Sequence, residues 1–333
     1  MIANPAIVAL TAGAVLTAAS GLFAAGAGLT ILRGWDRSSG AEDQLARERR
    51  TELVSVILAR TLPFQFLSFF LFIHTADRIH ALFPGAMCAA GTLNAGAMGY
   101  PVLGLKMVNL ILCGLWLVLD HLDRMAPDDP LIRPKYRLLV GPAALLVLEA
   151  VWQYRFFADL RPNVITSCCG SLFGANAAGI GGEIAGLPPR PVAAAFFAGS
   201  LAVFASGVRF LFTGRGARTF SRLCGIFAIL AMISLVSFIS VYFYQLPTHR
   251  CPFCILQREY GHVGYPLYLG LLAAAIPGMG VGLVDRMARS ESPATAALRF
   301  QRRLCAVALA GVALFVGTAL YPMATGDFVY LGY

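Results

Sequence analysis

Charged residues are scarce in this chain of 333 residues, because Asp, Glu, Lys and Arg together supply only 13% of it. Hydrophobic residues supply 58%, and the mean hydropathy is +0.71. A soluble domain carries about 25% charged residues, so this composition excludes a soluble protein. The net charge of +9 therefore bears on membrane topology, and we expect no nucleic-acid partner.

Several familiar signatures are also missing. The sequence has no Cys-x-x-Cys-His for covalent haem, no phosphate-binding Gly-x-x-x-x-Gly-Lys, and no connection long enough for a nucleotide-binding domain. ATP-driven chemistry within this chain is therefore not expected. The N-terminal Met-Ile-Ala-Asn-Pro lacks a basic segment, and arginines rather than a cleavage site follow the first apolar run. We expect that run to remain as a membrane span.

Eight apolar runs are long enough to cross the roughly 30 Å of a bilayer core. They cover about 6–32, 53–75, 101–119, 138–157, 192–212, 224–246, 266–284 and 305–323. Arginine and lysine concentrate in the first, third, fifth and seventh connections, which the positive-inside rule places in the cytoplasm. We predict an all-α polytopic membrane bundle of about eight transmembrane helices, with both termini extracytoplasmic and residues 1–333 forming one integral membrane domain. It would lie among the lipids of a bacterial inner membrane.

The eight cysteines divide by this topology. Five lie in the even-numbered connections, which we expect to face the periplasm: Cys88, Cys168, Cys169, Cys251 and Cys254. Disulfides persist on that side of the membrane and not in the cytosol. The other three, Cys113, Cys224 and Cys305, fall inside spans or at their cytoplasmic edges, where a cysteine usually behaves as a small hydrophobe.

The sixth connection reads His-Arg-Cys-Pro-Phe-Cys-Ile-Leu-Gln-Arg over residues 249–258. A Cys-x-x-Cys spacing lets two sulfurs form a disulfide, and neighbouring cations favour the reactive thiolate. The tripeptide Gly-Tyr-Pro follows Cys254 at 264–266 and follows Cys88 at 99–101. The repeated tripeptide indicates that the hairpins 53–119 and 224–284 are related repeats. The alternative is that Pro opens helices and Tyr marks membrane interfaces generally.

The segment Cys251-x-x-Cys254-Ile255-x-x-Arg258, placed directly before a predicted span, resembles the active-site hairpin of the DsbB family of quinone-linked disulfide oxidases. The resemblance covers one hairpin. It implies that the dithiol passes electrons to a bound quinone and that Arg258 helps to hold that quinone. The chain departs from the family in having eight predicted spans instead of four, and no cysteine after Cys305.

The resulting hypothesis is a thiol–disulfide oxidoreductase that passes electrons between an extracytoplasmic thiol protein, thioredoxin-like or other, and a membrane quinone. The adjacent Cys168 and Cys169 would be a shuttle pair, because a disulfide between neighbours is strained and easily reduced. Cys88 is left over; it either resolves a mixed disulfide or is an unrelated thiol.

Two other functions fit the same residues. His249, Cys251, Cys254 and His262 supply two soft sulfurs and two imidazoles that suit Zn(II), Cu(I) or Hg(II), which would indicate a metal-binding or metal-transport protein. The other alternative is a scaffold subunit, in which the cysteines serve only to cross-link loops through disulfides.

Ionisable residues inside the predicted spans are few. Glu149 is the clearest, since a buried carboxylate in hydrocarbon needs a partner. We predict a pair with Arg60 or Lys106, serving either as structural glue or as a proton route.

Overall fold

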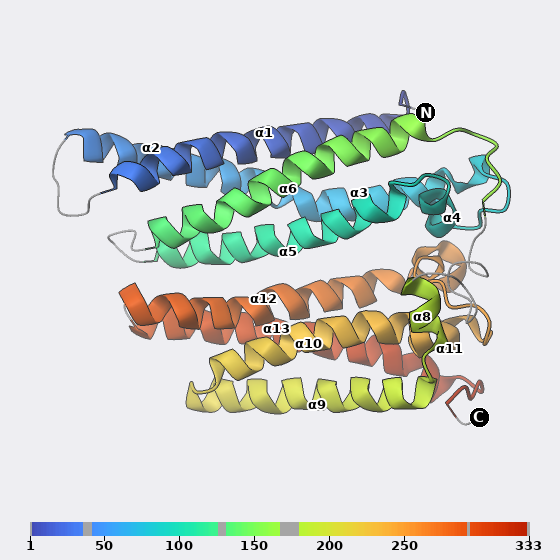
Figure 1. The fold of residues 1–333 in the computed structure, drawn as a ribbon. Helices are drawn as coiled ribbons and strands as arrows, with labels where there is room; N and C mark the ends of the chain where they lie inside the picture. Colours follow the sequence, from blue (N-terminus) through green and yellow to red (C-terminus); the bar gives the residue numbers. More distant parts are fainter. Residues whose placement is uncertain (1, 36–41, 126–130, 167–179, 292–293, 332–333) are drawn as a thin grey trace. The chain divides into compact units, whose positions relative to one another are not determined.

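The computed structural model describes residues 2–35, 42–125, 131–166, 180–291 and 294–331. Every regular element in these ranges is a helix, which confirms the all-α prediction for the described part of the chain. The helices group into two compact units (Figure 1). Unit 1 comprises Met1–Thr75, Gly96–Pro162 and Arg289–Pro293; unit 2 comprises Ala76–Ala95, Asn163–Ala288 and Ala294–Tyr333. One membrane domain and related hairpins both stay predictions.

Unit 1 is built from long helices packed side by side. They are α1 (Pro5–Gly34), α2 (Glu42–Thr61), α3 (Phe64–Arg78, ending in unit 2), α5 (Gly99–Asp123) and α6 (Ile132–Asp159). α6 packs against both α1 and α5, and α2 packs against α1. Gly28 of α1 allows close approach, because a Cβ there would lie 2.4 Å from the ring of Tyr136 in α6. Trp116 and Tyr136 are among the largest buried side chains of this core.

Unit 2 holds the remaining described helices, except for the last residues of α12, which fall in unit 1. The long ones are α9 (Pro189–Thr213), α10 (Ala217–Ser234), α12 (Gly264–Glu291) and α13 (Ala294–Thr325). The short ones are η1 (His80–Leu82), α4 (Ala89–Asn94), α8 (Ile180–Gly186), the π-helix η2 (Leu235–Ile239), α11 (Ser240–Tyr244), η3 (Cys254–Leu256) and η4 (Arg258–Tyr260). Stacked, tilted and edge-on ring pairs of Phe196, Phe227 and Phe315 join α9, α10 and α13 in the core.

Helices α12 and α13 touch at two glycines. A Cβ on Gly311 would lie 2.6 Å from the Ala274 nitrogen and 2.7 Å from the Gly270 oxygen. Only a residue without a side chain allows this backbone approach, as is common where membrane helices pack.

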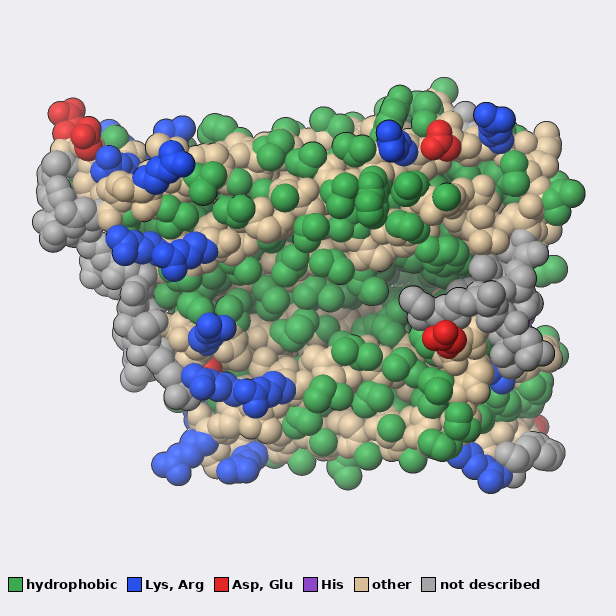
Figure 2. All heavy atoms as spheres, viewed as in Figure 1, with side chains coloured by type: hydrophobic (Ala, Val, Ile, Leu, Met, Phe, Trp, Pro, Cys, Tyr) green, Lys and Arg blue, Asp and Glu red, His purple; other side chains and the backbone are tan. Residues whose placement is uncertain are grey.

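Seven stretches of helix in the described residues are long and apolar enough to cross a membrane. Figure 2 shows hydrophobic side chains over the middle of the helices and Lys and Arg side chains gathered towards helix ends. The chain therefore has the make-up of a multi-pass integral membrane protein. The one predicted span that is not among these seven is 138–157, which falls on α6. This helix has 28 residues and carries Lys135, Arg137, Glu149 and Arg155. That span, the orientation of the termini and the bacterial inner membrane stay predictions.

Candidate functional site: a cluster of three cysteines

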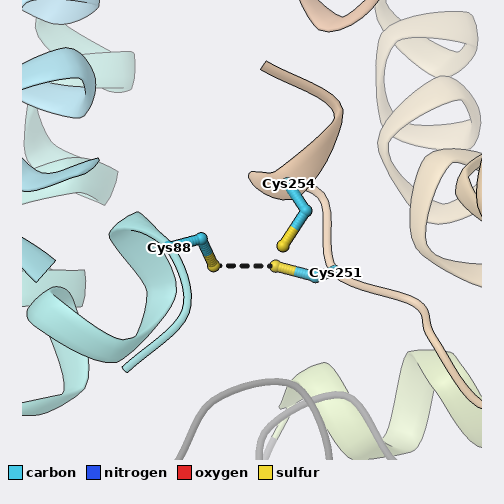
Figure 3. A group of neighbouring side chains, drawn as sticks. All are labelled: Cys88, Cys251 and Cys254. Atoms are coloured by element: carbon cyan, nitrogen blue, oxygen red, sulfur yellow. Dashed lines mark hydrogen bonds between the residues drawn. The ribbon is translucent and has the colours of Figure 1, made fainter. Parts of the chain in front are cut away.

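Three cysteines of unit 2 lie close together in the fold. Cys88 precedes Cys251 by 163 residues in the chain, and Cys254 follows three residues later. Cys88 directly precedes α4, Cys251 lies in the loop after α11, and Cys254 opens η3. The Sγ atoms of Cys88 and Cys251 are 3.5 Å apart, and all three sulfurs lie within 4.8 Å of one another (Figure 3). Cys88 and Cys251 are fully buried and Cys254 is 2% exposed. The sulfurs are thus close enough to react with one another or to share one ion.

Two tyrosines hold the Cys-x-x-Cys loop through its backbone. The Tyr244 hydroxyl, at the end of α11, donates to the carbonyl of Cys251. The Tyr268 hydroxyl, in the first turns of α12, donates to the carbonyl of Pro252 at 2.7 Å. The Gln257 backbone N–H donates to the carbonyl of Cys254 at 2.9 Å and closes the turn of η3. The loop is therefore tied to the helices on both of its sides.

Asp77 and Gln257 hold the Cys88 segment against this loop. Asp77 Oδ1 accepts from the backbone N–H of Ala89 at 3.1 Å and from Gln257 Nε2 at 2.9 Å. Gln257 Nε2 also donates to the carbonyl of Met87 at 3.0 Å. The residues on either side of Cys88 are both bonded, so its position relative to Cys251 is defined by side chains outside the cluster.

The turn that leads to Cys88 depends on a glycine. Gly85 has a φ of +86°, and a Cβ there would lie 2.2 Å from the carbonyl oxygen of Thr166. Thr166 in turn donates its backbone N–H to Pro84 at 3.0 Å and its hydroxyl to the carbonyl of Gly91 at 3.0 Å. A residue with a side chain at position 85 would be strained by the left-handed backbone conformation, and its Cβ would also clash with the carbonyl oxygen of Thr166.

His249 is the titratable side chain next to the cluster on the Cys-x-x-Cys loop. Its ring centroid lies 4.1 Å from that of Tyr244. Burial lowers the pKa of His249 below its usual value of 6.5, and the negative charge of a Cys88 thiolate opposes that shift. Burial therefore favours the neutral imidazole at pH 7.

The other residues singled out from the sequence lie elsewhere. Arg258 is exposed on η4. His262 is exposed, its Nδ1 lies 2.7 Å from the carbonyl of Leu256, and neither it nor His249 belongs to the group of atoms within 4.8 Å. Cys168 and Cys169 fall outside the described residues. Of the predicted residues, the structure thus joins Cys251 and Cys254 with Cys88.

The predicted partner of Glu149 is also resolved, in unit 1. Lys106 Nζ lies 2.8 Å from Glu149 Oε1 and donates to Ser68 Oγ at 2.7 Å. Asn109 and Gln65 donate to Glu149 Oε2 at 2.6 and 3.3 Å. All five side chains are buried. The pairing with Lys106 is confirmed, and these contacts connect α3, α5 and α6.

Sequence reasoning missed Asp77, Tyr244, Gln257 and Tyr268. Their role depends on contacts between segments far apart in the chain, and no short motif marks them. Comparison with protein-family models, with curated proteins and with solved structures gives no match.

Proposed function

We propose that the protein is a membrane thiol–disulfide oxidoreductase in which one disulfide moves among Cys88, Cys251 and Cys254. The observation that carries this proposal is the 3.5 Å between the sulfurs of Cys88 and Cys251, with Cys254 in the same group. Thiol–disulfide exchange requires a thiolate to attack one sulfur of a disulfide while the other sulfur leaves. Three sulfurs within 4.8 Å of one another supply the attacking, central and leaving atoms.

The proposed cycle has three steps. First, the Cys88 thiolate attacks the Cys251 Sγ of a Cys251–Cys254 disulfide. A Cys88–Cys251 bond forms, and Cys254 leaves as a thiolate. Second, a partner dithiol reduces the Cys88–Cys251 disulfide and itself becomes a disulfide. Third, a quinone takes two electrons and two protons from the thiols of Cys251 and Cys254, which restores their disulfide and yields a quinol.

The side chains around the cluster support these steps. His249 interacts electrostatically with a Cys88 thiolate, so a positive charge on the imidazole would favour that thiolate. Tyr244 and Tyr268 hold the backbone of Cys251 and Pro252, so the sulfurs meet at a defined distance. Cys168 and Cys169 are the proposed shuttle to the partner protein, because a disulfide between adjacent cysteines is strained and easily reduced. Arg258 is the proposed quinone contact on the family resemblance alone.

Differential alkylation read by peptide mass spectrometry tests the proposal in native membranes. The quinone pool is held oxidised in one sample and reduced in the other, and the redox state of each cysteine is measured. We expect Cys251 and Cys254 to be largely disulfide-bonded with the oxidised pool and largely thiols with the reduced pool. Cys113, buried in α5 outside the cluster, is the internal control. Equal redox states of Cys251 and Cys254 in both samples would refute the quinone-linked cycle.

The same geometry favours a second candidate, a site for a soft metal ion. Metal–sulfur bonds of about 2.3 Å in a trigonal site separate the sulfurs by about 4 Å. The Cys88 and Cys251 sulfurs are 3.5 Å apart, and all three sulfurs lie within 4.8 Å of one another, which is near that value. For this candidate, anaerobic titration of the purified protein with Cu(I) would give one tightly bound ion per chain that protects all three thiols from alkylation. Loss of that binding in Cys88→Ser, but not in Cys113→Ser, would assign the ion to the cluster.

A further inference from the structure

Three serines of unit 2 lie at consecutive third positions where α10 passes through the π-helix η2 into α11. Ser234, Ser237 and Ser240 are each 0% exposed, and the residues between them are also buried. The π geometry shows in the bond from the Ser240 N–H to the carbonyl of Leu235, five residues back. Such π segments inside helices occur frequently at functional sites.

Their hydroxyl oxygens have no hydrogen-bond partner among the described residues. A serine within a helix ordinarily donates to a carbonyl three or four residues back. Ser200 in the neighbouring α9 does so, donating to Phe196 at 2.7 Å. A buried hydroxyl without a partner is costly, and three in seven residues of a membrane helix call for a ligand that satisfies them.

Water is the ligand whose chemistry fits. A hydroxyl can both donate and accept, and a buried water makes about three hydrogen bonds to otherwise unsatisfied polar groups. A larger polar molecule would have to enter a stretch in which Phe238 and Ile239 are also 0% exposed. Water needs only the space of one small molecule at each hydroxyl.

The stripe of serines leads to the cysteine cluster within the same unit. Tyr244 lies four residues after Ser240, which places both on one face of α11. The Tyr244 hydroxyl donates to the carbonyl of Cys251, and the ring of His249 packs on Tyr244. From Ser234 to Tyr244 a helix rises about 15 Å.

We propose that Ser234, Ser237 and Ser240 bind a file of internal water molecules that carries protons between the cysteine cluster and the membrane interior of unit 2. The proposal rests on the proposed redox function, since forming one disulfide removes two protons from two thiols and a membrane quinone must receive two. The water molecules and the serines exchange protons and end each cycle unchanged.

The first test measures the water without any redox cycle. Purified full-length protein is exposed to X-ray-generated hydroxyl radicals in H2(18)O, and oxygen incorporation is mapped by mass spectrometry. We expect labelling of Phe238, which is fully buried between the serines, whereas the equally buried Phe220 stays unlabelled. Labelling of Phe238 should fall several-fold in a Ser234→Ala, Ser237→Ala, Ser240→Ala variant and persist in Ser200→Ala. An unlabelled Phe238 in the wild type would overturn the proposal.

The second test measures the proton path. The reduced protein is reoxidised by a short-chain ubiquinone, and the disulfide-bonded fraction of Cys251 is followed with time. We expect the triple variant to be about tenfold slower than the wild type, and Ser200→Ala to be unchanged. Ser237→Ala alone serves if the triple variant does not fold. Equal rates in the variant and the wild type would overturn this inference while the redox function stands; no reoxidation in the wild type would instead count against the redox function.

Discussion

Gln257 and Asp77 lie 180 residues apart in the chain and are joined by a hydrogen bond of 2.9 Å. The same Gln257 nitrogen reaches the carbonyl of Met87, and the same Asp77 oxygen accepts from Ala89. The two side chains thereby hold Cys88 from both sides, beside the Cys-x-x-Cys loop. A thiol on a separate segment stays within reach of Cys251 because this pair fixes the two segments together.

Replacing Gln257 by Leu removes its side-chain bonds to Asp77 and to the carbonyl of Met87. Two hydrogen bonds of this kind are together worth about 1–3 kcal/mol. We expect a lower free energy of unfolding and a smaller yield of the Cys88–Cys251 disulfide after mild oxidation, measured by peptide mapping. Glu259→Gln, a change at an exposed position two residues on, is the control. A wild-type disulfide yield in Gln257→Leu would show that the two segments are held by other contacts.

Breaking the buried pair of unit 1 should destabilise the protein strongly. Lys106→Met or Glu149→Leu leaves one charge without its partner inside the membrane, at a cost of about 3–5 kcal/mol. The double variant should lose less than the sum of the two single variants, because no lone charge remains. Unfolding in detergent micelles, followed by circular dichroism, measures all four proteins. Additive losses would contradict the coupling inferred from the 2.8 Å contact.

The contact of α12 with α13 should not tolerate even one methyl group at Gly311. Its Cβ would meet the backbone of Gly270 and Ala274, and overpacking of this type costs about 1–3 kcal/mol. Gly317→Ala, six residues further along α13 with nothing within 4 Å of its Cβ, is the matched control. We expect a lower melting temperature for Gly311→Ala alone. If both variants melt together, the close approach of the two helices is not as described.

His249 should make the stability of unit 2 depend on pH. Burial lowers the pKa of His249 in the folded protein, so the unfolded chain binds a proton first as the pH falls. The contribution is fully present above the unfolded pKa of about 6.5 and is lost as the pH falls from there towards the folded pKa. Melting temperatures between pH 7.5 and pH 5 should fall less in His249→Phe than in the wild type. His262→Phe, at an exposed position, should retain the wild-type slope.

Much of the fold follows from local sequence. Apolar runs predicted the long helices because hydrocarbon requires about 20 apolar residues and internally satisfied backbones. The partner of Glu149 was predictable as well, because few cations occur inside the spans. The predicted number of eight membrane spans stays a prediction because of α6. Lys135 and Arg137 lie in this helix, which is longer than its apolar run.

The site was predictable only in its sulfurs. The spacing of Cys251 and Cys254 marks a dithiol, but nothing near Cys88 indicates that it joins them. Asp77 and Gln257 act through a contact across 180 residues, which no local pattern encodes. The serines were overlooked because serine is common in membrane helices, and only burial without a partner distinguishes these three.

The most direct test of the central claim is disulfide mapping of Cys254→Ser and Cys88→Ser in native membranes under oxidising conditions. Exchange among three sulfurs predicts a Cys88–Cys251 disulfide as the main form in Cys254→Ser and a Cys251–Cys254 disulfide in Cys88→Ser. Cys88 and Cys251 recovered as alkylated thiols in Cys254→Ser would contradict the account, because the 3.5 Å contact would then support no disulfide exchange.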